Sequence, residues 1–192
     1  MKRLAIFASG SGTNASNIID HFSTSKTAKV TRVFVNNPEA YVIKRVAGTG
    51  VDVVIFDRID FYSSGKVLHL LEEAKTDLIV LAGFLWLVPS DIIAAYQGRI
   101  INIHPALLPD FGGKGMYGER VHRAVIDSGM KKSGITIHMV NEHYDSGDII
   151  CQQECEVLEN DTPESLAARI HKLEYKFFPA AIENLLTGKR GC

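Results

Sequence analysis

The chain has 192 residues, of which 46% are hydrophobic and 22% are charged, and its formal net charge is -1. This composition is typical of a globular protein that buries most of the surface its unfolded form exposes. Scattered basic residues argue against a nucleic-acid binder, and the lack of a long apolar run argues against a membrane-spanning protein, so we expect a cytoplasmic location.

Cysteine usage points to a reducing compartment. The three cysteines, Cys151, Cys155 and Cys192, are an odd number without the spacing of a disulfide scaffold, so we expect free thiols. If Cys151 and Cys155 lie on one strand, their α-carbons are roughly 13 Å apart, which is too far to ligate one tetrahedral ion. We therefore expect no metal site.

The first half of the chain alternates apolar, strand-like runs with amphipathic segments, while residues 57–64 are expected to be a connecting segment. This alternation predicts right-handed βαβ units, and therefore an α/β fold with a mostly parallel, twisted sheet and helices on both faces. We expect strands at residues 1–8, 30–35, 51–56, 77–82 and 99–104, and helices at residues 15–22, 40–47, 65–75 and 89–96.

The second half changes this pattern. After a helix at residues 119–128, two strands at residues 135–140 and 148–157 follow each other without a helix between them. Adjacent strands of this kind predict antiparallel pairing at the C-terminal edge of the sheet. No linker interrupts the chain, so we expect a single domain over residues 1–192.

A last helix begins with a typical start signal, a hydroxyl residue followed by proline and an acid, at residues 162–164. We expect Pro179 to kink or end this helix. One face of this helix carries an apolar stripe, and Glu174 flanks it. The Glu174 carboxylate could reach a ligand hydroxyl or simply lie at the helix edge. The expected buried stripe consists of Leu166, Ile170, Leu173 and Phe177.

A glycine-rich turn follows the first strand and opens the first helix. Strand, turn and helix in this order form an anion site, because free backbone donors and the positive end of the helix dipole meet there. Gly10, Gly12 and Ala15 fit the dinucleotide pattern, but the second strand ends in residues 36–38, Asn-Asn-Pro, without a carboxylate to bind a ribose. We therefore prefer a single phosphate to NAD, and a plain tight turn without ligand stays open.

An apolar loop at residues 83–88 follows the fourth strand and contains the only tryptophan, Trp86. Such a loop could accept a flat heterocycle and use its backbone amides for the ring edge. The alternative is that Phe84 and Leu87 simply fill the core. A second loop, at residues 112–118, holds four glycines and is expected to be mobile or tightly folded near the site.

Asn102 and His104 lie two residues apart in the run Arg-Ile-Ile-Asn-Ile-His, so on an extended strand both side chains share one face. Pro105 ends the strand, which places the pair at the carboxyl end, where open α/β sheets bind ligands. Asp145 lies in a later turn-forming loop. The alternatives are that Asn102 caps the loop and that His104 is a satisfied core histidine.

This set of side chains suits acyl transfer in which the substrates supply both nucleophile and electrophile. An amide donor at Asn102 and an imidazole at His104 can stabilise the oxyanion of a tetrahedral intermediate. Asp145 can hold His104 in its charged form or accept the proton of an attacking amine through water. No serine or cysteine lies in a recognised nucleophile motif.

Four segments together resemble the family of formyltransferases that use 10-formyltetrahydrofolate, in order over nearly the whole chain. They are Gly-Ser-Gly-Thr-Asn at residues 10–14, Leu-Ala-Gly-Phe at 81–84, Asn-Ile-His-Pro-Ala-Leu-Leu-Pro at 102–109, and His138 with Asp-Ser-Gly at 145–147. The resemblance implies a Rossmann-like formyltransferase fold. It also implies transfer of a formyl group to the amine of glycinamide ribonucleotide, a step of purine synthesis, with 10-formyltetrahydrofolate as co-substrate.

The resemblance implies roles for individual residues. Asn102, His104 and Asp145 would be catalytic. The ribose phosphate would be held by Gly12, Thr13 and Asn14, and the ribose hydroxyls by Glu174. The folate would contact Phe84, Leu85, Trp86, Leu87, Val88, Ile100, Val140, Asn141 and Asp145.

Two departures from the family are visible. Trp86 and Asp110 stand where many members have Arg and Lys, so we expect Lys114, in an apparent insertion, to restore the charge. Rival activities share the motif, namely formylation of methionyl-tRNA, which adds an RNA-binding domain, and hydrolysis of the formyl donor, which adds a regulatory domain. A non-catalytic phosphate- or nucleotide-binding module is a further alternative. Monomer and homodimer both stay open.

Overall fold

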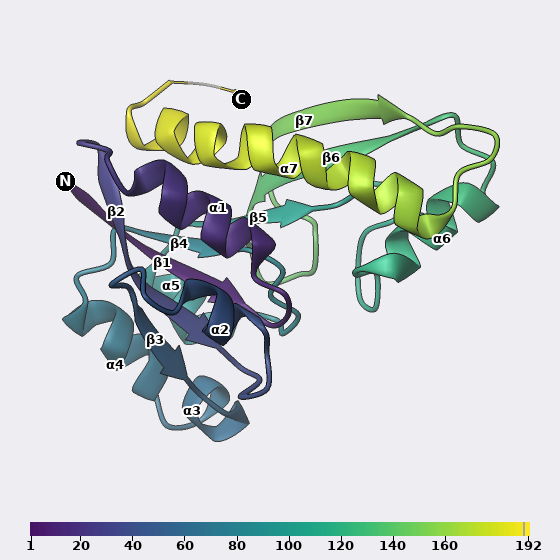
Figure 1. Cartoon of the computed structure of the whole chain (residues 1–192). Helices are drawn as coiled ribbons and strands as arrows, with labels where there is room; N and C mark the ends of the chain where they lie inside the picture. Colours follow the sequence, from purple (N-terminus) through teal and green to yellow (C-terminus); the bar gives the residue numbers. More distant parts are fainter. Residues whose placement is uncertain (190) are drawn as a thin grey trace. The chain divides into compact units, whose positions relative to one another are not determined.

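The computed structural model describes residues 1–189 and 191–192. Its strands form a seven-stranded sheet in the order β3-β2-β1-β4-β5-β6-β7 (Figure 1). The sheet is mostly parallel, with antiparallel pairing at its C-terminal edge, which confirms the expected α/β fold class. The chain divides into two compact units, Met1–Ile101 and Asn102–Cys192, which we describe in turn. A single domain over residues 1–192 stays a prediction.

The first unit is built from successive strand and helix pairs. Strand β1 pairs in parallel with β2 and with β4, and β2 pairs in parallel with β3. Residues 4–8 of β1 are almost fully buried because such a strand is covered on both faces. The elements are β1 (Lys2–Ala8), α1 (Thr13–Phe22), β2 (Ala28–Val35), α2 (Val42–Val46), β3 (Asp52–Ile55), α3 (Arg58–Tyr62), α4 (Lys66–Glu73), β4 (Leu78–Leu81) and α5 (Ser90–Ala95).

The second unit contains most of β5, which begins two residues before the unit does. Its strands β6 and β7 are antiparallel, and helix α7 packs against both of them and against α6 (Figure 1). The start of α7 is fixed by a capping box between Thr162 and Ser165, as the start signal predicts. The elements are β5 (Ile100–His104), α6 (Glu119–Asp127), β6 (Lys132–Met139), β7 (Ile149–Glu156) and α7 (Pro163–Leu186).

Residues 57–64 are not a plain connection, because they contain the short helix α3. Asp57 caps it by accepting a hydrogen bond from the Asp60 backbone N–H at 2.8 Å. The helix buries Phe61 among aromatic neighbours such as Phe56, with 5.1 Å between ring centroids. Burial of one large ring therefore stabilises a five-residue helix that is too short to be recognised by periodicity.

The expected buried stripe of α7 is only half right. Leu166 and Ile170 are fully buried, whereas Leu173 and Phe177 are partly exposed and Glu174 and Phe178 take their places. The buried positions of α7 therefore recur every four residues, and one of them is the acidic residue Glu174. A pattern of apolar residues alone cannot reveal such a position.

The expectation that Pro179 ends α7 is wrong, because the helix continues to Leu186. Proline removes one backbone hydrogen bond from a helix interior. Here Pro179 is itself buried, next to Phe178 and one turn before Ile182. The packing of this apolar face offsets the missing bond.

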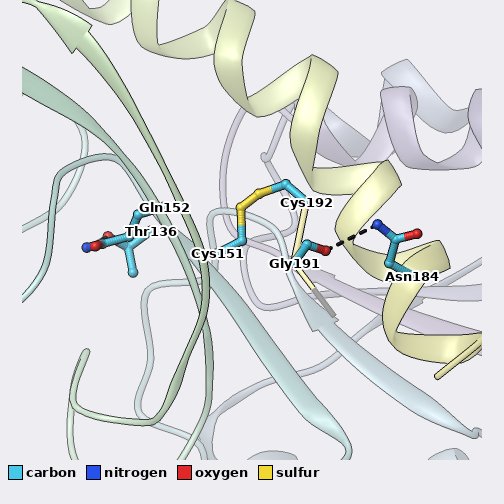
Figure 2. The surroundings of a disulfide bond; sticks show 6 residues. All are labelled: Thr136, Cys151, Gln152, Asn184, Gly191 and Cys192. Atoms are coloured by element: carbon cyan, nitrogen blue, oxygen red, sulfur yellow. Dashed lines mark hydrogen bonds between the residues drawn. A yellow bond between two sulfur atoms is a disulfide. The ribbon is translucent and has the colours of Figure 1, made fainter. Parts of the chain in front are cut away.

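The expectation of three free thiols is wrong for two of them, since the structure joins Cys151 of β7 to Cys192 (Figure 2). Their α-carbons are 5.7 Å apart, within the range of disulfides. The Asn184 side chain donates to the Gly191 carbonyl at 3.2 Å, which holds the same segment against α7. The partners are 41 residues apart, so spacing gives no hint of the pair. Cys155 is free.

Candidate active site

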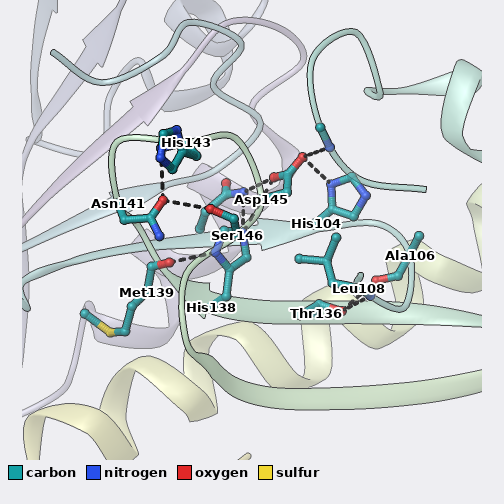
Figure 3. Close-up of polar contacts among 12 residues, drawn as sticks. His104, Ala106, Leu108, Thr136, His138, Met139, Asn141, His143, Asp145 and Ser146 are labelled. Atoms are coloured by element: carbon teal, nitrogen blue, oxygen red, sulfur yellow. Dashed lines mark hydrogen bonds and ion pairs between the residues drawn. The ribbon is translucent and has the colours of Figure 1, made fainter. Parts of the chain in front are cut away.

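The structure brings together the three side chains that the sequence singles out as catalytic. Asn102 and His104 lie on β5, and Asp145 lies in the loop between β6 and β7. The Asn102 amide nitrogen is 3.4 Å from Asp145 Oδ1, and His104 Nδ1 is 3.5 Å from Asp145 Oδ2 (Figure 3). His104 is 3% exposed, so its contact with Asp145 is shielded from water.

The segment after β5 closes over two of these groups. His104 Nε2 donates to the Phe111 carbonyl oxygen at 2.8 Å, and the Gly113 backbone N–H donates to Asp145 Oδ2 at 2.9 Å. Gly112 allows this approach, because a Cβ there would overlap Leu108 and press on the Asp145 side chain. The glycine-rich stretch is therefore tightly folded here, and backbone groups occupy positions that a substrate could take.

His138 is a fourth member of the cluster that the sequence reasoning did not place among the catalytic residues. It is 2% exposed, and its Nε2 lies 3.1 Å from the Asn102 amide nitrogen. Its Nδ1 lies 2.8 Å from the Met139 carbonyl oxygen (Figure 3). The alternation of β6 places His138 on the same face as Thr136, which is the signal that could have found it.

Thr136 holds the backbone that follows His104. Its hydroxyl donates to the Ala106 carbonyl at 2.7 Å and accepts from the Leu108 N–H at 2.9 Å (Figure 3). Gln152 of β7 donates to the same hydroxyl and to the Leu108 carbonyl, each at 2.9 Å. The carboxyl end of β5 is thus fixed by side chains from both antiparallel strands.

Electrostatics favour an ionised carboxylate beside a neutral imidazole. Burial opposes ionisation of Asp145, but the nearby His138 and His104 and the Gly113 backbone N–H outweigh it and hold the pKa of Asp145 below its usual value. Burial lowers the pKa of His104, although Asp145 and the Phe111 carbonyl act in the opposite direction. Asp145 thus stays ionised, and it can stabilise positive charge that develops on His104.

The glycine turn of the first unit leads directly into α1. Gly12 has a φ of 72° and precedes α1, and a Cβ there would overlap Val42 of α2. The Val42 N–H donates to the Gly10 carbonyl at 3.1 Å, and Arg45 Nε donates to the Ser11 carbonyl at 2.8 Å. The first turn of α1 contains Thr13 and Asn14, the residues expected to hold a phosphate.

The apolar loop is tied to this turn within the same unit. The Ser9 N–H donates to the Gly83 carbonyl at 3.1 Å, and the Leu85 N–H donates to the Ser9 hydroxyl, also at 3.1 Å. Phe84 and Trp86 belong to an aromatic cluster and Val88 is buried, whereas Leu85 is 45% exposed. Phe84 and Leu87 are both half-buried, so the alternative that these two residues simply fill the core is only partly met.

The remaining expected site residues lie as follows. Glu174 is 6% exposed on α7, and Ile100 is buried at the start of β5. Val140 and Asn141 are half-buried in the loop after β6, and the Asn141 side-chain oxygen accepts from the His143 N–H at 2.9 Å and from the Ser146 hydroxyl at 3.0 Å (Figure 3).

Among residues 1–189 and 191–192, no group of three His, Cys, Asp or Glu side chains could hold a metal ion. Within the same residues, no helix combines the length and apolar character needed to cross a membrane.

Comparison with known proteins gives consistent matches. A family model described as "Formyl transferase" matches residues 2–182. The chain is 40% identical over 183 residues to the chloroplastic phosphoribosylglycinamide formyltransferase of Arabidopsis thaliana, covering 92% of this chain but 63% of the relative. It is 36% identical to the Bacillus subtilis phosphoribosylglycinamide formyltransferase, covering 97% of this chain and 95% of the relative.

Solved structures agree with these matches. The crystal structure of phosphoribosylglycinamide formyltransferase from Bacillus halodurans aligns with a TM-score of 0.87 at 38% identity, covering 97% of this chain and 96% of that one. The chain spans less than two thirds of the length of the two plant relatives, 63% for Arabidopsis thaliana and 61% for Vigna unguiculata.

Proposed function

Because the chain belongs to the formyl transferase family, we propose that it transfers the formyl group of 10-formyltetrahydrofolate to the amino group of glycinamide ribonucleotide, in purine biosynthesis. The observation that carries the proposal is the cluster of the buried His104 with the half-buried Asn102 and Asp145. It supplies an amide, an imidazole and a carboxylate to one reaction centre, as acyl transfer between two substrates requires.

Binding is divided among the elements that carry suitable groups. The backbone N–H groups of Gly12, Thr13 and Asn14 suit the ribonucleotide phosphate, since they meet at the N-terminus of α1. Glu174 would accept hydrogen bonds from the ribose hydroxyls. The folate pterin would lie against residues 84–88, Ile100 and residues 140–145.

In the proposed reaction, the amine nitrogen attacks the formyl carbon and the carbonyl electrons move to oxygen. His104 Nε2 would release the Phe111 carbonyl and donate to this oxyanion, together with the Asn102 amide. Asp145 would take the proton of the amine through water. The tetrahedral intermediate then collapses and the bond from the formyl carbon to the donor nitrogen breaks. That nitrogen takes up the proton that Asp145 holds, passed back through water, and Asp145 is ionised again.

The test is an assay of one enzyme preparation with three acceptors. Formyl donor is supplied with glycinamide ribonucleotide, with charged initiator tRNA, and with water alone. We expect a formylated product only with the ribonucleotide. Product with the tRNA alone would favour methionyl-tRNA formylation, and release of free formate would favour a hydrolase. No product in any arm would favour a phosphate-binding module.

Location and assembly stay predictions. A cytoplasmic location is supported by the composition, although two relatives are named chloroplastic. The proposed partners are the two small-molecule substrates, and the protein would act as a monomer or a homodimer.

A further inference from the structure

We infer that His138 is a positioning residue that sets the orientation of the Asn102 amide. In a single tautomer, His138 accepts one amide hydrogen of Asn102 and thereby aims the other at Asp145 and the reaction centre. The effect of His138 on catalysis rests on the proposed function, but the hydrogen bond between His138 and Asn102 does not depend on the identity of the substrate.

The tautomer of His138 follows from its contact with a backbone carbonyl. A carbonyl oxygen only accepts hydrogen bonds, so the ring nitrogen 2.8 Å from the Met139 carbonyl must carry a hydrogen. That nitrogen is Nδ1. In the neutral ring the hydrogen is then absent from Nε2, which becomes an acceptor.

This tautomer in turn fixes the orientation of the Asn102 side chain. An accepting Nε2 of His138 requires a donor opposite it, and the group at 3.1 Å is the amide nitrogen of Asn102. Asp145 Oδ1, at 3.6 Å from the same ring nitrogen, is beyond hydrogen-bond distance. The alternative orientation of the amide would place its oxygen against a ring lone pair, in a site where His138 is 2% exposed and water cannot compensate.

The remaining amide hydrogen of Asn102 faces Asp145 Oδ1 at 3.4 Å, which is a long contact and therefore a weak one. When Asp145 takes up the proton of the amine, it loses its negative charge and much of its strength as an acceptor. The Asn102 N–H that faced Asp145 can then donate a hydrogen bond to the oxyanion. Meanwhile His138 still accepts from the other amide hydrogen, which prevents rotation of the amide.

The decisive experiment compares His138→Leu, His138→Gln and Asn102→Ala with the double variant of His138→Leu and Asn102→Ala. Leucine removes the acceptor, so we expect kcat to fall about tenfold or more with the KM of each substrate changed less than about threefold. Glutamine can place an amide oxygen near the position of Nε2, so most of the activity should return. His69→Leu on the exposed face of α4 is the control, with unchanged kcat.

The double variant tests whether His138 acts through Asn102. If it does, adding His138→Leu to Asn102→Ala costs little further activity, because the group being oriented is already gone. Additive losses in kcat would overturn the inference, as would an equal loss of activity in the leucine and glutamine variants.

A second readout needs no substrate. Nitrogen-15 NMR of the His138 ring in the wild-type protein should report a protonated Nδ1 and a bare Nε2, and Asn102→Ala should perturb the Nε2 signal. A hydrogen on Nε2 instead would overturn the inference. Failure of the proposed function would look different, because the wild-type enzyme would then not formylate the ribonucleotide while the NMR result would be unaffected.

Discussion

At the scale of single residues, the chemistry of the site depends on which ring nitrogen of each histidine carries a hydrogen. His104 directs Nε2–H at the Phe111 carbonyl and leaves Nδ1 facing Asp145, so donation to a substrate requires Phe111 to move away. His138 has the opposite tautomer. The two rings therefore have different tasks, one facing the proposed oxyanion and one holding an amide.

Sequence alone could predict Asn102, His104 and Asp145 because their motif is dense and specific. It could not predict that backbone groups of Phe111 and Gly113 bind two of these side chains, since any residue supplies a carbonyl and an N–H. His138 belongs to the same resemblance, but its contact with Asn102 could not be predicted, because a histidine on an alternating strand is most often a core residue.

Lys114 is the residue that we expect to restore the charge missing at Trp86 and Asp110. It is exposed in the glycine-rich segment after β5. We predict that Lys114→Ala raises the KM of at least one substrate about threefold or more, while kcat changes little, because an exposed cation of this kind contributes to substrate binding and not to the transition state. Steady-state kinetics with each substrate varied in turn measures this, and two unchanged KM values would contradict the assignment.

His122 on α6 should make the stability of the protein depend on pH. Burial lowers the pKa of His122 from 6.5 to about 4, helped by His171 and His104 and opposed by Glu119. Between these values the unfolded chain binds the proton and the folded protein does not. The free energy of unfolding should therefore fall by up to about 3 kcal/mol as the pH drops from 6.5 to about 4.

Urea unfolding at about pH 7 and about pH 4.5 tests this prediction. We expect the loss of stability on acidification to be smaller in His122→Leu than in the wild type. His104 keeps part of the effect, because its pKa is lowered in the same direction. Equal losses in the two proteins would show that His122 does not contribute.

At the scale of elements, hydrophobic periodicity predicted every strand and most helices, with boundaries moved by a few residues. It failed where tertiary packing decides the outcome. Helix α3 depends on the burial of Phe61, and α7 passes through Pro179 because its apolar face is buried on both sides of the proline. Neither effect leaves a local pattern in the sequence.

The turn before α1 depends on the missing side chain of Gly12. Alanine there would need a φ of 72° and would overlap Val42, so the turn should move and the backbone N–H groups at the start of α1 should lose their alignment. We predict that Gly12→Ala raises the KM of the ribonucleotide tenfold or more, as about 1.4 kcal/mol of lost binding implies. Gly10→Ala, where a Cβ meets nothing within 4 Å, should cost less. Equal effects of the two changes would contradict the role of Gly12.

At the scale of the whole molecule, the strand order and the antiparallel edge follow from the switch between βαβ units and adjacent strands. The pairing of Cys151 with Cys192 does not follow from the sequence pattern, because it depends on how the chain returns to β7 after α7. An odd number of cysteines suggested free thiols, and only the three-dimensional arrangement distinguishes Cys155 from the other two.

The disulfide makes a prediction about thiol content and stability. Denatured protein should react with one equivalent of thiol reagent without reductant and with three after reduction, because Cys155 alone is free. Reduction or Cys192→Ser should lower the free energy of unfolding by about 2–4 kcal/mol, since the bond closes a long loop. Three reactive thiols in the unreduced protein would contradict the pairing.

The central claim is that the cluster around the buried His104 performs formyl transfer. The most direct test measures two quantities for His104→Ala: its turnover with glycinamide ribonucleotide and its Kd for the formyl donor. The account predicts that kcat falls about 100-fold or more while this Kd stays within about threefold of the wild-type value. Unchanged turnover, or a loss of donor binding as large as the loss of turnover, would contradict it.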